Sequence, residues 1–519
     1  MNSRSNSIVA LEKFILSTRD SGYKSTASAI SELVDNALQA NATTVRILID
    51  AQDAQSGSDV KIQVADDGMG MTSRVLVQAM RFGGSSRFND RSGLGRFGMG
   101  LPNASLAQAR RVEVYTWQSA NSILYTYLDV DEIANGLLES VPEPTSQKTV
   151  EHIERINPQS GTTVLWIQCD RLDNRRPSTL IRKLRSSLGR VFRHFLTRGI
   201  RIEINGVPIE PVDPLYLDQR ARLSGARAFQ STWTCEIYAN PLDANSPIGK
   251  VDVLFSELPV DAWHDLSNDK KREMGIANGA GVSIVRGDRE VDYGWFFMGA
   301  KRRENYDDWW RCEVRFDPVL DEAFGITHTK QQARPKDYLT EALTDFIETT
   351  AKALNARARD AFSTIKLNKS SSSAEQIAVS RDARMPPLPP DTGDTSHQLT
   401  HLISRNPSLR ALTQGSESGQ AGYHLLEDEL TSSVFLEPMR AGNAIVGVLN
   451  PRHQFYRQVY APIVSGSELN NEQLGSAIRL MVLAAARAEA SFVEPEERRI
   501  LSAFRTEWSR AMDVLLSKR

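Results

Sequence analysis

Glu32 and Asn36 are a pair of residues whose types and spacing suit catalysis. Apolar residues recur around them at helical spacing, which predicts a helix over residues 27–40. Residues four positions apart lie on one face of a helix, so both side chains should point the same way. A carboxylate can take a proton from an attacking water, and an amide oxygen can help to hold a divalent cation. Taken alone, such a pair more often belongs to a solvent-exposed polar face.

A second group, Asp66, Gly68 and Gly70, follows a strand predicted over residues 60–64. A carboxylate at this position can accept a hydrogen bond from the exocyclic amino group of adenine. The glycines allow the backbone to approach a flat ring closely and to adopt positive φ. Asp-Gly pairs also mark ordinary β-turns, which is the alternative interpretation of this group.

A third element is a glycine-rich segment that leads into a predicted helix, with glycines at Gly93, Gly95, Gly98 and Gly100. Backbone N–H groups in such a loop, and at the start of the helix that follows, can bind phosphate oxygens. Alone, the segment would also suit a flexible loop. The chain has no Walker-type phosphate loop, so a phosphate site here would be of another kind.

In their order and separation these three elements resemble the motifs of the GHKL ATPases, the group that contains Hsp90, gyrase B, MutL and MORC proteins. The resemblance implies a Bergerat-fold domain with ATP and Mg²⁺ as ligands. In that family the glutamate of the first motif is the general base and the asparagine coordinates magnesium, which assigns these roles to Glu32 and Asn36. The motifs as a whole look closest to those of MORC-like ATPases.

The resemblance also assigns the adenine-binding part of the site. Asp66 would read the base, and Thr162, in a Gly-Thr pair that begins a predicted strand, would place its hydroxyl beside Asp66. Relatives often have an acid where this chain has Gln39, so nucleotide affinity is expected to differ while the fold is not. The glycines that the family places around the nucleotide are Gly68 and Gly70 at the base and Gly95, Gly98 and Gly100 in the lid over the phosphates.

The predicted helices and strands give an α+β protein. Residues 1–198 are expected to form an α/β sandwich, a Bergerat-type mixed sheet with helices on one face. A transducer-like α/β domain is expected over 199–366, followed by a Pro- and Ser-rich linker, extended and poorly ordered, over 367–396. A small, mainly helical C-terminal domain of unknown role is expected over 397–519, with one strand at 444–449.

Lys330 is a candidate catalytic residue outside the first domain. It lies in a loop before a long helix predicted over residues 337–365. Gyrase B and MutL relatives project a lysine from their transducer domain onto the γ-phosphate, and Lys330 matches that arrangement in context. A cation there would stabilise the charge that develops during phosphoryl transfer. The alternative is an ordinary solvated lysine.

Composition narrows the class of protein. The chain has 519 residues, 40% hydrophobic and 24% charged, as in soluble globular proteins. Its formal net charge of -2 gives no global attraction to nucleic acid or to a membrane. The three cysteines are too few for a disulfide framework or a zinc site. No apolar run approaches the roughly 20 residues that span a bilayer. We therefore expect a cytoplasmic protein without membrane contact.

Several functions are compatible with such a nucleotide fold. The sequence favours a dimerising ATPase of the MORC and MutL kind, an ATP-driven clamp or switch that acts on double-stranded DNA or in a restriction- or defence-like system. Any DNA cutting would then belong to a partner effector or nuclease. The alternative is an Hsp90-like chaperone or an ATP-gated signalling protein with a protein partner. A sensor histidine kinase is disfavoured because no histidine precedes His152, and a topoisomerase subunit because its cleavage signatures are not visible.

Overall fold

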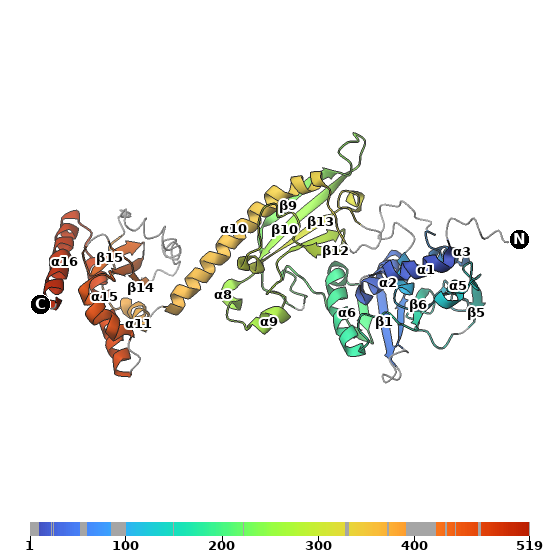
Figure 1. The fold of residues 1–519 in the computed structure, drawn as a ribbon, viewed down its shortest axis with the longest axis horizontal. Coiled ribbons are helices and arrows are strands. Elements are labelled where there is room, and N and C mark those ends of the chain that lie inside the picture. Colours follow the sequence, from blue (N-terminus) through green and yellow to red (C-terminus); the bar gives the residue numbers. More distant parts are fainter. Residues whose placement is uncertain are drawn as a thin grey trace. The chain divides into compact units, whose positions relative to one another are not determined.

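The computed structural model describes residues 10–21, 23, 25–51, 60–84, 100–148, 150–221, 223–326, 332–370, 373–390, 422–430, 433–441, 443–465 and 469–517. The chain divides into two compact units (Figure 1). The first comprises Met1–Pro259 and Asp265–Asn355, and the second comprises Val260–His264 and Ala356–Arg519.

The first unit contains an eight-stranded mixed sheet in the order β5-β4-β3-β6-β2-β1-β7-β8. Strand β1 pairs antiparallel with β2 and parallel with β7, and β3 lies antiparallel between β4 and β6. Branched and aromatic residues, which suit a pleated and packed surface, dominate its central strands. The strands are β1 (Thr44–Ala51), β2 (Val60–Asp66), β3 (Arg111–Trp117), β4 (Ile123–Asp129), β5 (Thr145–Gln147), β6 (Gly161–Ile167), β7 (Arg201–Ile204) and β8 (Val207–Pro208).

Helices cover one face of this sheet and share its apolar core. Ile30 and Leu33 of helix α2 pack in one cluster with Ile47 and Ile62 of the strands. The start of α2 is capped, because the hydroxyl of Ser25 accepts a hydrogen bond from a backbone N–H one turn later. The helices are α1 (Leu11–Ser21), α2 (Thr26–Gln39), α3 (Ser73–Met80), α4 (Gly100–Leu106), α5 (Val130–Ala134), α6 (Pro177–Val191) and α7 (Arg193–Thr197). The predicted α/β sandwich is confirmed.

A five-stranded sheet in the order β12-β11-β13-β10-β9 also belongs to the first unit. Helix α10 (Asp337–Ser370) packs on it through Leu339, Leu343 and Ile347, whose four-residue spacing marks one helical face. The strands are β9 (Arg227–Tyr238), β10 (Ile248–Glu257), β11 (Val282–Arg286), β12 (Arg289–Gly294) and β13 (Trp310–Phe316). The short helices of this part of the first unit are α9 (Asn268–Glu273), η2 (Asn305–Trp309) and η3 (Pro318–Leu320), and α8 (Val260–Trp263) is assigned to the second unit.

The second unit has a three-stranded sheet in the order β14-β16-β15. Tyr423, Ile445 and Leu483 form part of its core. The sequence predicted only the central strand, which is apolar and fully buried along its length, and missed the two neighbouring strands. The elements are β14 (Gly422–Glu427), β15 (Leu436–Ala441), β16 (Ala444–Leu449), η4 (Tyr456–Tyr460), α14 (Ala461–Ser465), α15 (Leu469–Glu489) and α16 (Pro495–Leu516).

The expected linker over residues 367–396 needs correction. Helix α10 continues to Ser370, and a further helix, α11, spans Ser373–Asp382. The Glu375 side chain accepts a hydrogen bond of 2.7 Å from the backbone of Leu425, and Ala378 is buried in the core of the second unit. A short helix of this kind is stabilised by its packing and not by its composition, which explains why its sequence resembled a linker.

Two long helices, α15 and α16, close the described part of the second unit. Arg505 of α16 forms ion pairs with Glu489 of α15 and with Glu437 of β15. Another face of α16 exposes Ile500 and Phe504, one helical turn apart. Within the described ranges, no helix combines the length and apolar character needed to cross a bilayer.

Candidate nucleotide site

Helix α2 carries the two residues predicted to act at a phosphate. Glu32 is buried, with 4% of its surface exposed, whereas Asn36 is partly exposed. Within the part of the chain that the structure describes, the Asn36 side chain forms no hydrogen bond, so its amide oxygen is available to a ligand. The helix thus presents a buried carboxylate and an accessible amide about one turn apart.

The start of α4 lies directly against Glu32. A Cβ atom placed on Gly100 would stand 2.1 Å from Oε1 and 2.7 Å from Cδ of Glu32. Because interiors are close-packed, no side chain fits at this position unless the carboxylate moves. Two predicted site residues from separate motifs are therefore in contact, and the absence of a side chain at Gly100 is what permits it.

Asp66 ends strand β2 as a buried carboxylate, with 8% of its surface exposed. Its Oδ1 accepts a hydrogen bond of 2.9 Å from the backbone N–H of Gly68. Burial raises the pKa of Asp66 to about 7, although backbone N–H groups of Gly68 and Thr162 act in the opposite direction. The donors to this carboxylate within the described ranges are backbone N–H groups, and no ion pair to it occurs there.

Thr162 is paired with Asp66 in the register of strands β2 and β6. Its hydroxyl lies 3.1 Å from that of Thr116 on β3. The Thr116 oxygen also accepts a hydrogen bond of 2.8 Å from the backbone of Met71, which ties the loop after Asp66 to the sheet. Thr116 was missed from the sequence because its role depends on strand register, which a single Thr in a predicted strand does not reveal.

The loop after β2 requires glycine at Gly70. Its φ is +68°, and a Cβ there would stand 2.1 Å from the carbonyl oxygen of Trp117. The neighbouring Met69 N–H donates a hydrogen bond of 3.0 Å to the carbonyl of Ala40, just beyond the end of α2. The loop that carries Asp66 is therefore fastened both to the sheet and to the C-terminal end of the helix that carries Glu32.

Asp67, next to Asp66, has a different role. Its carboxylate accepts hydrogen bonds of 2.8 and 2.9 Å from the backbone N–H groups of Thr43 and Thr44 and one of 2.7 Å from the Thr43 hydroxyl. Burial would raise its pKa, but these donors outweigh burial and hold the pKa below its usual value. Asp67 anchors the turn between α2 and β1, whereas Asp66 keeps its acceptor capacity.

Three predicted site residues, Gly95, Gly98 and Lys330, lie outside the described residues. Gly93, another glycine of the same segment, also lies outside them. The described part of that segment begins with Gly100 at the start of α4.

One contact that the sequence did not predict reaches α2 from the second sheet. Asp35 lies between Glu32 and Asn36 on the helix, and its carboxylate oxygens lie 2.9 and 2.8 Å from Nε of Arg289 on β12. Both side chains are buried, with 0% and 4% of their surface exposed. Charged groups are rarely buried this completely unless they are paired.

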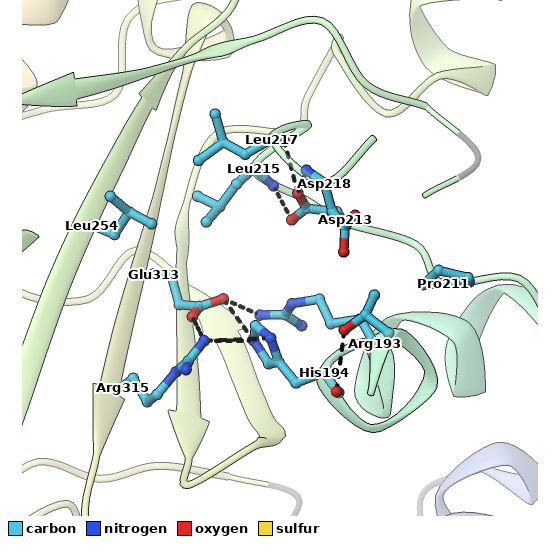
Figure 2. Close-up of a pocket in the computed structure, with 11 residues that line it drawn as sticks. Arg193, His194, Pro211, Asp213, Leu215, Leu217, Asp218, Leu254, Glu313 and Arg315 are labelled. Carbon is cyan, nitrogen blue, oxygen red and sulfur yellow. Dashed lines mark hydrogen bonds and ion pairs between the residues drawn. The ribbon is translucent and has the colours of Figure 1, made fainter. Parts of the chain in front are cut away.

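A cavity of about 270 Å³ lies apart from these residues, between α7 and strands β10 and β13 (Figure 2). Glu313 is at its wall and accepts hydrogen bonds of 2.6 Å from Arg193 and 2.8 Å from Arg315, with His194 at 3.2 Å. Burial would raise the pKa of Glu313, but these neighbours hold it well below its ordinary value. No predicted site residue lines this cavity.

The described residues fit an adenine nucleotide with a divalent cation. Asp66 offers a buried acceptor for an amino group, and Asn36 offers an oxygen ligand. Two buried polar atoms, Nε2 of Gln39 and Oδ1 of Asn103, have no hydrogen-bond partner among the described residues. They lie on or beside α2 and α4, the helices that meet at Gly100. A bound ligand or water would satisfy such atoms.

Comparison with known proteins agrees with this geometry. Residues 23–163 match the family described as histidine kinase-, DNA gyrase B- and HSP90-like ATPases. A stretch of 68 residues is 46% identical to the DNA mismatch repair protein MutL in each of two strains of Halobacterium salinarum. That match covers 13% of this chain and only 10% of each relative. Residues 23–163 are therefore a GHKL domain, of the histidine kinase-, DNA gyrase B- and HSP90-like ATPase family.

Proposed function

We propose that this chain is a Mg²⁺-dependent ATPase in which bound ATP closes a homodimer. The proposal depends on two contacts along α2. Glu32 lies against Gly100 of α4, and the loop after Asp66 is hydrogen-bonded to the carbonyl of Ala40. At 1.5 Å per residue, Ala40 is about 12 Å further along the helix direction than Glu32. A nucleotide with its base at Asp66 would extend its phosphates toward Glu32. The family match of residues 23–163 supports ATP as the ligand.

In this proposal each residue has one role in the reaction ATP + H₂O → ADP + phosphate. Glu32 accepts the proton of the attacking water, and its buried position favours a defined orientation. Asn36 holds Mg²⁺, which neutralises phosphate charge when bound. Asp66 and Thr162 hold adenine, and Gly68 and Gly70 admit its ring. The glycines proposed to cover the phosphates are Gly95, Gly98 and Gly100, with Lys330 proposed to contact the γ-phosphate from the second sheet's region.

Gly100→Ala should lower ATP turnover at least tenfold, a larger factor than any loss of nucleotide affinity. The added Cβ would displace the Glu32 carboxylate, and a shift of about 1 Å at a reacting group can cost a factor on the order of 100. Steady-state hydrolysis and equilibrium nucleotide binding measure the two effects. Gly475→Ala is the matched control, because a Cβ on that helical glycine would make only ordinary contacts, the nearest at 3.4 Å. Equal turnover in both variants would contradict the placement of Glu32.

The output of the ATPase is proposed to be a clamp on double-stranded DNA, with a partner nuclease or effector for any cutting. The similarity to MutL, a DNA mismatch repair protein, supports a DNA-directed role over the chaperone alternative. The matched stretch is only a tenth of those proteins, so it supports the class of partner and not a repair function.

Solution mass should reveal the clamp. Glu32→Ala is expected to double in mass with Mg-ATP, because it would bind ATP without consuming it, and to return to a monomer when ATP is removed. Asp66→Asn should stay monomeric at the same ATP concentration. Closed circular double-stranded DNA is then added before ATP, and the complex is challenged with 1 M salt. Retention of circular but not linear DNA would support a topological clamp. An ATP-dependent dimer that retains neither would favour a protein-directed switch.

A further inference from the structure

The Asp35–Arg289 ion pair lies at the point where the second sheet meets the helix that carries the proposed catalytic residues. On α2, Asp35 is three residues after Glu32 and directly before Asn36. The nearby phenol of Tyr23 has its pKa raised by burial and by the charges of Glu32 and Asp35, while Arg289 acts in the opposite direction. Tyr23, Glu32, Asp35 and Arg289 therefore lie within electrostatic range of one another.

Arg289 is held by a rigid hairpin. It begins strand β12, directly after the turn at Gly287, whose φ is +58°. Arg286, on the other arm of the hairpin, forms a two-bond ion pair of 2.6 and 2.8 Å with Asp321 in the same domain. This pair is almost as buried as the Asp35–Arg289 pair, with side chains 3% and 8% exposed. Bidentate Arg–carboxylate pairs are geometrically specific, so the hairpin turn is fixed relative to its own sheet.

The next residue extends the contact to the helices of the first sheet. Glu290 accepts hydrogen bonds of 2.6 Å from both Arg190 of α6 and Arg193 of α7. Arg193 also donates to Glu313 at the wall of the cavity (Figure 2). Buried charges therefore connect α2, through the hairpin, with α6, α7 and β13. Burying so many ionic groups is costly and adds little stability by itself, which points to a requirement for specific positioning.

We propose that Arg289 is a positioning residue, which holds α2 through Asp35 so that Glu32 and Asn36 are correctly placed for hydrolysis only when the second sheet is docked. The inference rests on the proposed ATPase function and adds Arg289 to the residues that turnover requires. ATP binding through Asp66 and Thr162 does not depend on this contact. Loss of Arg289 should therefore separate nucleotide binding from turnover.

Arg289→Met removes the cation and keeps a side chain of similar length. We expect kcat to fall by a factor of about 10 to 100, because the base and the cation ligand lose their alignment, while the dissociation constant for Mg-ATP changes less than threefold. Arg289→Lys keeps a cation near Asp35 and should recover part of the turnover. Single-turnover hydrolysis, equilibrium binding and thermal unfolding are measured on the same full-length preparations.

Arg286→Met is the matched control, since it breaks an almost equally buried ion pair of the same hairpin, and that pair does not involve α2. It should lower the unfolding temperature at least as much as Arg289→Met yet retain wild-type kcat below that temperature. If Arg289→Met does not fold, the double variant Asp35→Asn/Arg289→Met leaves no unpaired buried charge and carries the same test, with low kcat and retained ATP binding expected.

The outcomes separate the two proposals. A wild-type chain that hydrolyses ATP, with equal kcat in the folded Arg289 variant, would overturn the positioning role and leave the ATPase assignment standing. Equal losses of kcat in the Arg286 and Arg289 variants would also overturn it, because the pair would then be structural only. A wild-type chain that binds ATP without hydrolysing it would overturn both proposals.

Discussion

Glu32→Gln should slow ATP hydrolysis by at least about 100-fold while leaving ATP binding intact. Glutamine keeps the size of the side chain against Gly100, so the helix packing should survive, but an amide cannot take a proton from water. General bases contribute factors of about 100 to 10,000 to turnover, and kcat is expected to fall by an amount in that range. Single-turnover hydrolysis measures the loss of chemistry, and a fluorescent nucleotide titration measures binding.

Ser31→Ala provides the control on the same helix. Ser31 is as buried as Glu32, but its hydroxyl is satisfied within α2 by a hydrogen bond of 2.8 Å to the carbonyl of Ala27. Turnover in this variant should equal that of the wild type. Hydrolysis by Glu32→Gln at more than a tenth of the wild-type rate would remove Glu32 from the role of base and direct attention to another carboxylate.

The elements around the site were predictable because their signals are local. Apolar residues at helical spacing and a capping serine define α2, and the sequence placed this helix within one residue of its observed ends. The strand that carries Asp66 alternates apolar and polar residues and ends at a glycine-containing turn, and the strand that carries Thr162 begins with glycine and continues as an apolar run.

The contacts between motifs were not predictable from local pattern. The approach of Gly100 to Glu32 depends on how α4 packs on α2, and a glycine in a glycine-rich loop gave no sign of that partner. The Asp35–Arg289 pair joins residues 254 positions apart, so its formation is a property of tertiary packing alone. Asp35 stands among apolar residues of α2, and this position is the one sequence signal that indicated a cationic partner for it.

The C-terminal unit was the least predictable part for a different reason. Its strands β14 and β15 are held in the sheet by the apolar strand β16 between them, and their own sequences alternate polar and apolar residues only weakly. Helix α11 likewise depends on its burial against the rest of that unit. Elements stabilised by partners distant in sequence are missed when each segment is considered alone.

Asp66→Asn should weaken Mg-ATP binding by a factor of about 10 to 150, the equivalent of losing a hydrogen bond to a charged group worth about 1.5–3 kcal/mol. The carboxylate accepts from the amino group of adenine, whereas guanine presents a carbonyl acceptor at the same position. The wild type should therefore prefer ATP to GTP, and the variant should lose that preference. Competition binding with the two nucleotides at fixed Mg²⁺ concentration measures both the affinity and the selectivity.

The pH dependence of this binding should identify Asp66 as its cause. Because burial raises the pKa of Asp66 to about 7 in the nucleotide-free protein, the carboxyl is largely protonated at pH 6 and ionised at pH 8. Only the ionised form accepts at both oxygens, so wild-type affinity for ATP should fall as the pH is lowered from 8 to 6. The dependence should flatten in Asp66→Asn and persist in Asp67→Asn, whose wild-type carboxylate anchors Thr43 and Thr44 and has a lowered pKa. If the wild type, Asp66→Asn and Asp67→Asn all showed the same pH dependence, the titrating group would not be Asp66. The raised pKa of the buried Asp66 carboxyl would then have no effect on recognition of the base.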